Sequence, residues 1–435
     1  MKLLAALFAG LAPALAAAAD GIDSGDTAFV LFSAGLVLLM TPGLAFFYGG
    51  LVRAKNVVHT MNMSLVCMAF VGVAWALGGY SIAFSPGGGL NLFVGGLGWS
   101  GLVGVGGKPE PTLAATVPHG AFMLFQAMFA IITPALISGA LVERVRLKAF
   151  ALFAVLWSLL VYSPVAHWVW APGGWLRGLG ALDFAGGTVV HINAAAAAVV
   201  GAAMLGRRRG LKAPTVMPHS VPFAILGAGL LWFGWLGFNG GSALAANGVA
   251  AAAFANTFFA PAAAAATWAL IELTLHGKLS GVGLASGAVA GMVAITPAAG
   301  FVTPLSSLLL GAGAAAASFA AVRYRPRLGL DDSLDVFAIH GVAATLGALL
   351  TGLLATRAVN PDGADGSLGL LGVQALGVGA TLLWSGAVSF LLFKLVGLVT
   401  PLRADEQDEW TGLDMAEAGE RAYVSSETES SPHAA

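Results

Sequence analysis

Two histidines stand in long apolar stretches of the sequence, and each has an aspartate eight residues before it. The pairs are Asp183 with His191 and Asp332 with His340. A neutral imidazole offers one hydrogen-bond donor and one acceptor, and it can exchange a proton near neutral pH. Ionisable side chains at membrane depth are costly, and they usually mark the path of a substrate or a proton. The repeated pattern therefore indicates two matching segments that meet at one site.

The elements that carry these histidines must lie in a membrane. Of the 435 residues, 58% are hydrophobic and 9% are charged, whereas soluble domains have about 25% charged residues. The net charge of -1 argues against nucleic acid as a partner. The single cysteine, Cys67, excludes an intrachain disulfide and a CxxC metal site, and we expect it to be a buried thiol. We expect no metal and no cofactor.

Eleven apolar stretches are predicted to cross the membrane. Each can cross about 30 Å of hydrocarbon at a rise of about 1.5 Å per residue. Backbone polar groups find no water there, so each stretch must form its hydrogen bonds within a helix. The expected fold is an all-α polytopic membrane protein. Its spans lie near 26–51, 57–84, 119–142, 149–171, 186–205, 218–239, 248–275, 280–298, 303–322, 335–356 and 370–399.

The two ends of the chain differ from this membrane domain, 20–400. Residues 1–19 are predicted to be a signal peptide, because Lys2 precedes an apolar core that ends in small residues suited to cleavage. The alternative is an uncleaved first span, but this core is shorter than the roughly 20 residues that a span needs. The tail, 401–435, is acidic and polar, and Ser425–Ala435 is expected to be disordered.

Basic residues predict how the spans are oriented. With the mature N-terminus outside, thirteen lysines and arginines fall in loops on the cytoplasmic side, and three fall outside. This bias follows the positive-inside rule and supports an odd number of spans with a cytoplasmic tail. The outside residues are Lys108, Arg177 and Arg357. The inside residues are Arg53, Lys55, Arg144, Arg146, Lys148, Arg207, Arg208, Arg209, Lys212, Lys278, Arg323, Arg325 and Arg327.

A second repeated pattern extends the duplication beyond the histidines. Span 1 ends in Gly49-Gly50 with Asn56 six residues later, and span 6 ends in Gly240-Gly241 with Asn247 six residues later. Spans 1–5, about 26–205, and spans 6–10, about 218–356, are therefore interpreted as two copies. Because each copy has an odd number of spans, the second is inverted. Span 11 is left over and is expected to pack outside the bundle.

These stretches together resemble a known family. The sequence is similar to ammonium transporters of the Amt/Mep/Rh family, on the bacterial Amt branch, from Gly25 to Asp414. Sequence runs of this length, at the same spacing as in that family, are highly specific for it. The runs that carry the resemblance are Pro42–Arg53, Asp183–Asn193, Gly237–Ser242 and Asp335–Gly341.

The resemblance implies a function and a role for each matching residue. The implied protein is a transporter, not an enzyme, in the bacterial inner membrane. It recruits ammonium at an outer vestibule and conducts ammonia through a hydrophobic pore into the cytoplasm. The family forms homotrimers with one pore per subunit. The implied roles are recruitment by Phe129, Trp170 and Ser242, a gate of Phe129 and Phe238, a pore of His191, His340 and Trp235, and a buried support at Asp183.

The chemistry of ammonium agrees with these roles. A tryptophan face attracts a cation by about 0.5–2 kcal/mol, and a serine oxygen accepts one N–H bond. Moving the intact ion through an apolar tube costs tens of kcal/mol in a Born estimate, about an order of magnitude more. Ammonium can lose a proton, whereas potassium cannot. We therefore expect selectivity to come from deprotonation at or below the phenyl gate, with or without a separate proton transfer.

Each of these residues also has an ordinary structural interpretation. Asp183 can cap a helix rather than touch the ion. Phe129 and Phe238 can be packing residues, Trp170 can belong to an interfacial belt, and Ser242 can satisfy the backbone. The remaining histidines near span ends, including His59, His119 and His167, are expected to be interfacial.

Three rival functions remain open. Gly98-Trp99-Ser100-Gly101 fits the GxSG pattern of intramembrane serine proteases, although it lies in a glycine-rich outside loop. A sensor that binds ammonium without bulk flux is a second rival, and the tail contains no kinase or cyclase sequence. A third is an Rh-like channel for ammonia or carbon dioxide, which the ion-recruiting residues Trp170 and Ser242 disfavour.

The tail suggests a regulatory partner. In the resembling family, PII-type signal proteins dock on the cytoplasmic face and plug the pores. Gly412–Tyr423 matches the tail pattern of that family except at Ala418, where the pattern usually has a histidine. This departure leaves the contacts between tail and body open, but not the transport function.

Overall fold

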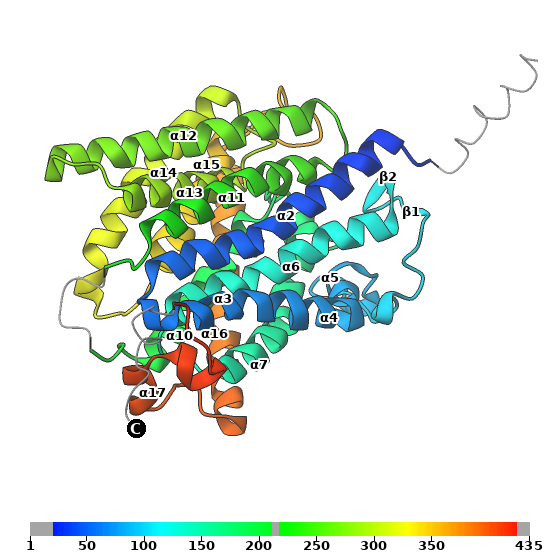
Figure 1. The fold of residues 1–435 in the computed structure, drawn as a ribbon. Coiled ribbons are helices and arrows are strands. Elements are labelled where there is room, and N and C mark those ends of the chain that lie inside the picture. The colour runs from blue at the N-terminus through cyan, green and yellow to red at the C-terminus, as the bar shows by residue number, and fades with distance from the viewer. Residues whose placement is uncertain (1–20, 211–216, 424–435) are drawn as a thin grey trace, which may run out of the picture.

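The protein is a bundle of helices that run alongside one another. The computed structural model describes residues 21–210 and 217–423, so the predicted signal peptide and Ser425–Ala435 lie outside the described residues. Figure 1 shows the start of α2 (Ser24–Leu51) at one end of the bundle, beside a small hairpin of β1 (Pro109–Glu110) and β2 (Ala114–Pro118). The tail lies at the opposite end, with α17 (Glu406–Thr411) and η12 (Asp414–Ala418).

Helices of the first predicted repeat follow the expected spans closely. Two of these spans are continuous helices in which π-helical turns interrupt the α-helix. After α2, the elements are η2 (Ala54–Asn56), α3 (Val57–Val66), η3 (Cys67–Val71), α4 (Gly72–Ala74), η4 (Trp75–Gly79), α5 (Tyr80–Phe84), η5 (Gly88–Leu90), η6 (Ser100–Leu102), α6 (His119–Leu141), α7 (Leu147–Trp157), η7 (Ser158–Tyr162), α8 (Ser163–Trp170), α9 (Trp175–Gly178), η8 (Gly187–Ile192) and α10 (Asn193–Leu205).

The second predicted repeat and the last span follow in the same manner. Its elements are α11 (Val221–Gly240), η9 (Gly241–Ala243), α12 (Gly248–His276), α13 (Gly281–Ile295), α14 (Pro304–Tyr324), η10 (Arg325–Leu328), η11 (Phe337–Val342) and α15 (Ala343–Leu354). The last long helix is α16 (Leu368–Val399).

Ten helices in the described ranges are long and apolar enough to cross a membrane. The stretch predicted at 280–298 is shorter than expected, because α13 has 15 residues, about 22 Å of helix. Its helical hydrogen bonds end near Thr296, and Pro297 lacks the N–H needed to continue them. The structure thus gives ten long spans and one short apolar helix.

The two predicted repeats meet along α2 and α11. These helices approach so closely that a Cβ atom on Gly227 would lie 2.2 Å from the backbone nitrogen of Phe47. A Cβ atom on Gly50 would lie 2.5 Å from the nitrogen of Ala224. Small residues at such crossings allow backbones to pack tightly where no hydrophobic effect drives association. This contact places the segments that carry the histidines in the interior of the bundle.

Candidate functional site

The segment that carries His191 begins at Asp183, which caps its first turn. Asp183 Oδ1 accepts hydrogen bonds from the backbone nitrogens of Gly186 at 3.0 Å and Gly187 at 2.6 Å. Its Oδ2 accepts two more, from Thr188 at 2.8 Å and Val189 at 3.1 Å. These four donors are the groups that an uncapped helix leaves unsatisfied. The carboxylate is thus fully engaged with the helix that it starts.

Asp332 has the equivalent place before His340. Its Oδ1 accepts from the nitrogen of Val336 at 3.0 Å, and its Oδ2 accepts from Phe337 at 2.7 Å. Both histidine segments begin with π-helical turns, η8 and η11. Such turns are rare and are often found at functional sites. The spacing of eight residues noted in the sequence is therefore the distance from a capping aspartate to the histidine it positions.

The two histidines face each other in the centre of the protein. His340 Nδ1 lies 3.2 Å from His191 Nδ1, and the ring planes differ by 16°. Both side chains are buried, with exposed fractions of 1% and 2%. A hydrogen bond between two Nδ1 atoms requires one ring to donate and the other to accept. The free Nε2 of the donor ring is then a bare acceptor, and that of the acceptor ring carries a proton.

Trp235 forms a wall beside this pair. Its ring stacks on His191 with 5.3 Å between centroids and 16° between planes. Its Nε1 donates to Thr296 Oγ1 at 2.8 Å, and this bond fixes the orientation of the indole. The space enclosed by these rings is about 10 Å³, which is near the volume that one water molecule requires.

Two phenyl rings close the site from one side. Phe129 and Phe238 have ring centroids 4.3 Å apart, and both are buried. Phe238 also lies 6.1 Å from the ring of His191. The structure therefore brings together the residues that the sequence assigned to the gate and the pore.

An open cavity of about 520 Å³ lies beyond the phenyl rings, on the side away from His340. Phe129, Trp170 and Ser242 all line it. Trp170 Nε1 donates to the backbone oxygen of Asp183 at 2.9 Å, which holds the indole at the edge of the cavity. Ser242 Oγ donates to the Phe238 oxygen at 2.8 Å, so its lone pairs remain available. We name this space the outer cavity.

The sequence did not single out Gln126, which also lines the outer cavity. Its side chain is 8% exposed, and Oε1 has no hydrogen-bond partner within the described chain. An acceptor in this position adds to that of Ser242. A polar residue one turn before Phe129 in an otherwise apolar helix was the available signal.

A second cavity of about 310 Å³ reaches His340 from the other side. Its lining includes Glu272 and Asp335, which the sequence analysis did not assign to the site. Asp335 has a φ of +60°, a strained conformation for this residue, and it pairs with Arg325 at 3.0 Å. An acidic residue inside the span of α12 was the signal that could have identified Glu272.

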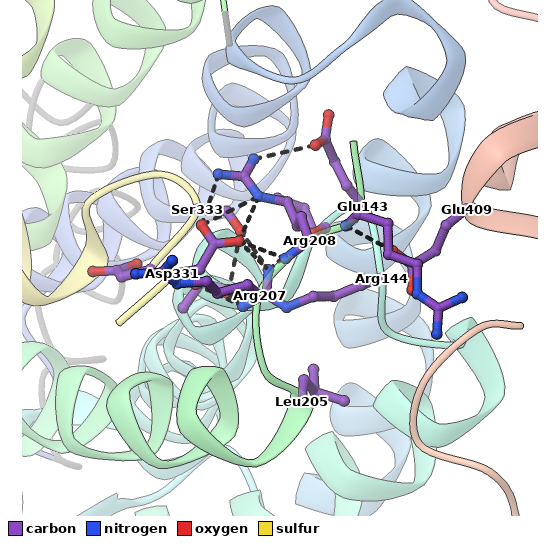
Figure 2. Close-up of polar contacts among 12 residues, drawn as sticks. Glu143, Arg144, Leu205, Arg207, Arg208, Asp331, Ser333 and Glu409 are labelled. Carbon is purple, nitrogen blue, oxygen red and sulfur yellow. Dashed lines mark hydrogen bonds and ion pairs between the residues drawn. The ribbon is translucent and has the colours of Figure 1, made fainter. Parts of the chain in front are cut away.

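A buried ion-pair cluster holds the segment before Asp332. Figure 2 shows Arg208 between two carboxylates: it lies 3.1 Å from Glu143 Oε2 and 2.9 Å from Asp331 Oδ1. Arg144 is not exposed. Its guanidinium donates to Ser333 Oγ and to the backbone oxygen of Asp331, both at 2.6 Å. Burial raises the pKa of Asp331, but the bonds and charge of Arg208 outweigh it and bring the pKa to about 2. The cluster is therefore charged at neutral pH.

The tail docks on the same end of the bundle. Asp414 Oδ1 accepts a hydrogen bond from the backbone nitrogen of His59 at 2.8 Å. The backbone nitrogen of Leu413 donates to Asn56 Oδ1 at 2.9 Å. Glu417 pairs with Arg146 at 2.9 Å. The departure at Ala418 therefore does not prevent contacts between tail and body.

Three histidines expected at the interface are buried instead. His59 and His167 are not exposed, and His119 is 4% exposed. His167 is held between the backbone oxygens of Ala83 and Asn91 at 2.9 and 2.7 Å. Proximity to the end of a span did not reveal that the rest of the protein buries these rings.

The fold and the site define a helical, multi-pass membrane protein with a buried histidine pair between two cavities. A model of the Ammonium Transporter Family matches residues 28–423. An ammonium transporter of Bacillus subtilis (strain 168) is 49% identical over 410 residues, which cover 93% of this chain and 100% of the relative. One from Mycobacterium bovis is 47% identical over 92% of this chain and 90% of its own length. The chain therefore belongs to the ammonium transporter family.

Solved structures agree with this assignment. The crystal structure of Saccharomyces cerevisiae Mep2 has a TM-score of 0.83 at 35% identity, covering 90% of this chain and 89% of that chain. A structure titled Sensor Amt Protein has a TM-score of 0.82 at 28% identity, covering 91% and 98%.

Proposed function

We propose that this protein transports ammonium by conducting ammonia between the two histidines. The observation that supports this most is the contact between His191 and His340, which are buried and separate two cavities of about 520 and 310 Å³. A passage of this size accepts a molecule as small as ammonia. Its apolar walls offer no shell of ligands to replace the water around an intact cation.

Recruitment of ammonium would take place in the outer cavity. The Trp170 face supplies a cation–π attraction of about 0.5–2 kcal/mol. The oxygens of Ser242 and Gln126 are available to accept N–H bonds. Together these groups hold the ion weakly, as a transporter that must release its substrate requires. Asp183 is proposed to support the site as a helix cap, because its lone pairs already face four backbone donors.

Deprotonation would follow at or below Phe129 and Phe238. The closed rings exclude the hydrated ion, and the histidine pair offers a bare nitrogen to the incoming molecule. When the proton shared by the two Nδ1 atoms shifts, the ring that receives it must release its own Nε2 proton, and the other ring must take up a proton at Nε2, for example from ammonium. Both rings are then neutral again, and the bare nitrogen has moved to the other ring. The pair can thus guide neutral ammonia and can also relay a proton. Potassium has no proton to lose and would remain in the outer cavity.

We further propose the arrangement in the membrane. With the short helix α13 as an eleventh crossing, the mature N-terminus is outside and the tail is cytoplasmic, in the bacterial inner membrane. Figure 1 supports this placement, because the start of α2 and the tail lie at opposite ends of the bundle. A homotrimer with one pore per subunit and a PII-type signal protein docked at the tail end complete the proposal.

Current and pH recordings on proteoliposomes after an ammonium jump test the function. We expect a selective response to ammonium and none to an equal jump of potassium. Replacing both His191 and His340 with Ala should abolish that selectivity. A double variant with unchanged ammonium flux and unchanged potassium exclusion would contradict the mechanism, as would a continuous water column in the resting protein. Saturable ammonium binding without flux in the wild type would instead support a sensor.

A further inference from the structure

A large apolar cavity lies behind the histidine segments, away from the space that the two histidines share with Trp235. It has a volume of about 620 Å³ and opens between α14 and α16. Ala196 and Gly341 form part of its floor, and Ala317 and Gly386 lie on its two walls. We name this space the α14–α16 groove.

The lining of the groove excludes water as a stable occupant. Thr345 is the one lining residue with a polar side chain, and the others are alanine, glycine, valine, leucine and phenylalanine. A water molecule needs two to four polar partners to remain in a buried site. An empty groove would deprive its walls of dispersion contacts. A hydrocarbon occupant therefore fits the groove better than water or an empty space.

The groove is also continuous with the surface that faces the lipid. On α16, Leu382 lines the groove and is 42% exposed, and the next residue, Leu383, is 76% exposed. The floor lies level with His191 and His340, because it includes residues within a turn or so of each, such as Ala195 and Gly341. Hydrocarbon chains of the bilayer are present at this depth.

We propose that the α14–α16 groove binds an acyl chain of a membrane lipid. The chain would pack against the rear of η11 and the start of α10, on the side opposite the pore. A Cβ atom on Gly341 would lie 3.1 Å from the Ala195 Cβ, so the two segments are already in contact at the floor. The bound chain would fill the space between the outer walls. This site is independent of the proposed transport function, because it is defined by apolar surface alone.

Gly386 offers a way to fill the groove from the protein side. A Cβ atom at Gly386 would meet nothing within 4 Å, so a larger side chain fits there. Gly379 lies on the same helix, also meets nothing within 4 Å, and does not line the groove. Gly386→Leu is therefore the test variant, and Gly379→Leu is its matched control.

Photolabelling in proteoliposomes tests the proposal. The probe is a phosphatidylcholine with a diazirine on one acyl chain, and the readout is the mass of labelled peptides after digestion. We expect label on the peptide that includes Phe337–Leu349. Gly386→Leu should lower this label about tenfold, because the loss of two methylene contacts already gives that ratio. Gly379→Leu should leave it unchanged.

A second measurement on the wild type avoids dependence on the folding of a variant. A detergent wash before irradiation should remove the probe lipid that surrounds the exposed phenylalanines Phe258 and Phe259 of α12, so that they are no longer labelled. The groove peptide should still be labelled after the same wash. The proposal fails if both sites lose label together, since that describes ordinary surrounding lipid. It also fails if Gly386→Leu retains full groove label. A crosslink from Ala317→Cys to another copy of the chain, with no lipid label, would assign the groove to a subunit contact.

Discussion

The two histidine segments have the same plan but are fixed by different interactions. His191 follows an aspartate that accepts four backbone N–H groups within its own segment. His340 follows Asp332, which accepts two, and the neighbouring Asp331 is held by Arg208 and Arg144 from distant loops. The aspartate of the first segment is therefore engaged within that segment, whereas the second segment also depends on charged side chains from elsewhere in the chain.

Matching segments in the two halves of a repeated fold can therefore be held in place by different interactions. Hydrogen bonds within a segment form as soon as that segment is helical. The ion pairs of the second segment require the first half, the connecting loop and the second half to be assembled together. The two histidines that meet at the site are thus held by different sets of interactions.

The largest effect is expected from removing the cap of the first segment. Asp183→Ala leaves four N–H groups without an acceptor, and we expect a loss of about 4 kcal/mol of stability or more. Asp332→Ala, the matched change in the second segment, should cost about half as much. The yield of monodisperse protein and the unfolding temperature in detergent measure both. Equal losses would remove the distinction between the two caps.

A smaller effect is expected from breaking the ion-pair cluster. Arg208→Gln leaves Glu143 and Asp331 with weaker partners, and removing one member of a buried pair costs about 3 kcal/mol at the lower limit. Arg209→Gln is the control, because Arg209 is 38% exposed and its pair with Glu406 is on the surface. Unfolding in denaturant should separate these variants. If Arg209→Gln destabilises as much as Arg208→Gln, the second segment does not depend on the buried cluster.

The pH dependence of the cluster gives a third test. The pKa of Asp331 is about 2 in the folded protein and ordinarily 3.8, so the charged form contributes about 2 kcal/mol. Because the folded pKa is depressed, this contribution is complete above about pH 4 and is lost as the pH falls towards 2. The difference in unfolding temperature between wild type and Asp331→Asn should therefore be constant from pH 7 to 5 and should shrink below pH 4. A difference that changes near pH 6 would point to another group.

The smallest effect is expected in the outer cavity, away from both segments. Ser242→Ala removes one weak acceptor, worth less than about 1 kcal/mol. We expect a rise of about threefold in the ammonium concentration for half-maximal flux, with the maximal flux unchanged. Ser306→Ala, a serine outside the cavity lining, serves as control. A fall in maximal flux would place Ser242 in the conduction step.

The sequence singled out most of the residues that meet around the histidine pair because its signals are local. A histidine within an apolar run and an aspartate eight residues earlier are visible without the fold, and family resemblance added Phe129, Phe238 and Trp170. The length of α13 was overestimated because the residues after Ile295 are apolar although they are not helical. Hydropathy alone does not distinguish a buried turn from the end of a span.

Features that depend on distant contacts were not predicted. Arg208 and Asp331 are 123 residues apart. From the sequence, Arg208 was assigned only to a loop on the cytoplasmic side. The second cavity, which reaches His340, was missed for the same reason, since Glu272 and Asp335 are far apart in the sequence. The contact of the His167 ring with the backbone oxygen of Asn91, which lies in a loop, also could not be located from the spans.

The hydrogen bond between the Asp414 carboxylate and the backbone nitrogen of His59, near the start of α3, has a consequence for biosynthesis. It joins positions 355 residues apart, so the ribosome must complete nearly the entire polypeptide before the amino end of α3 gains this acceptor. A product that terminates before Leu413 leaves the nitrogen of His59 and the amide oxygen of Asn56 without these partners. Premature termination would therefore produce a defect near the beginning of the protein, where membrane proteases can detect an incomplete chain.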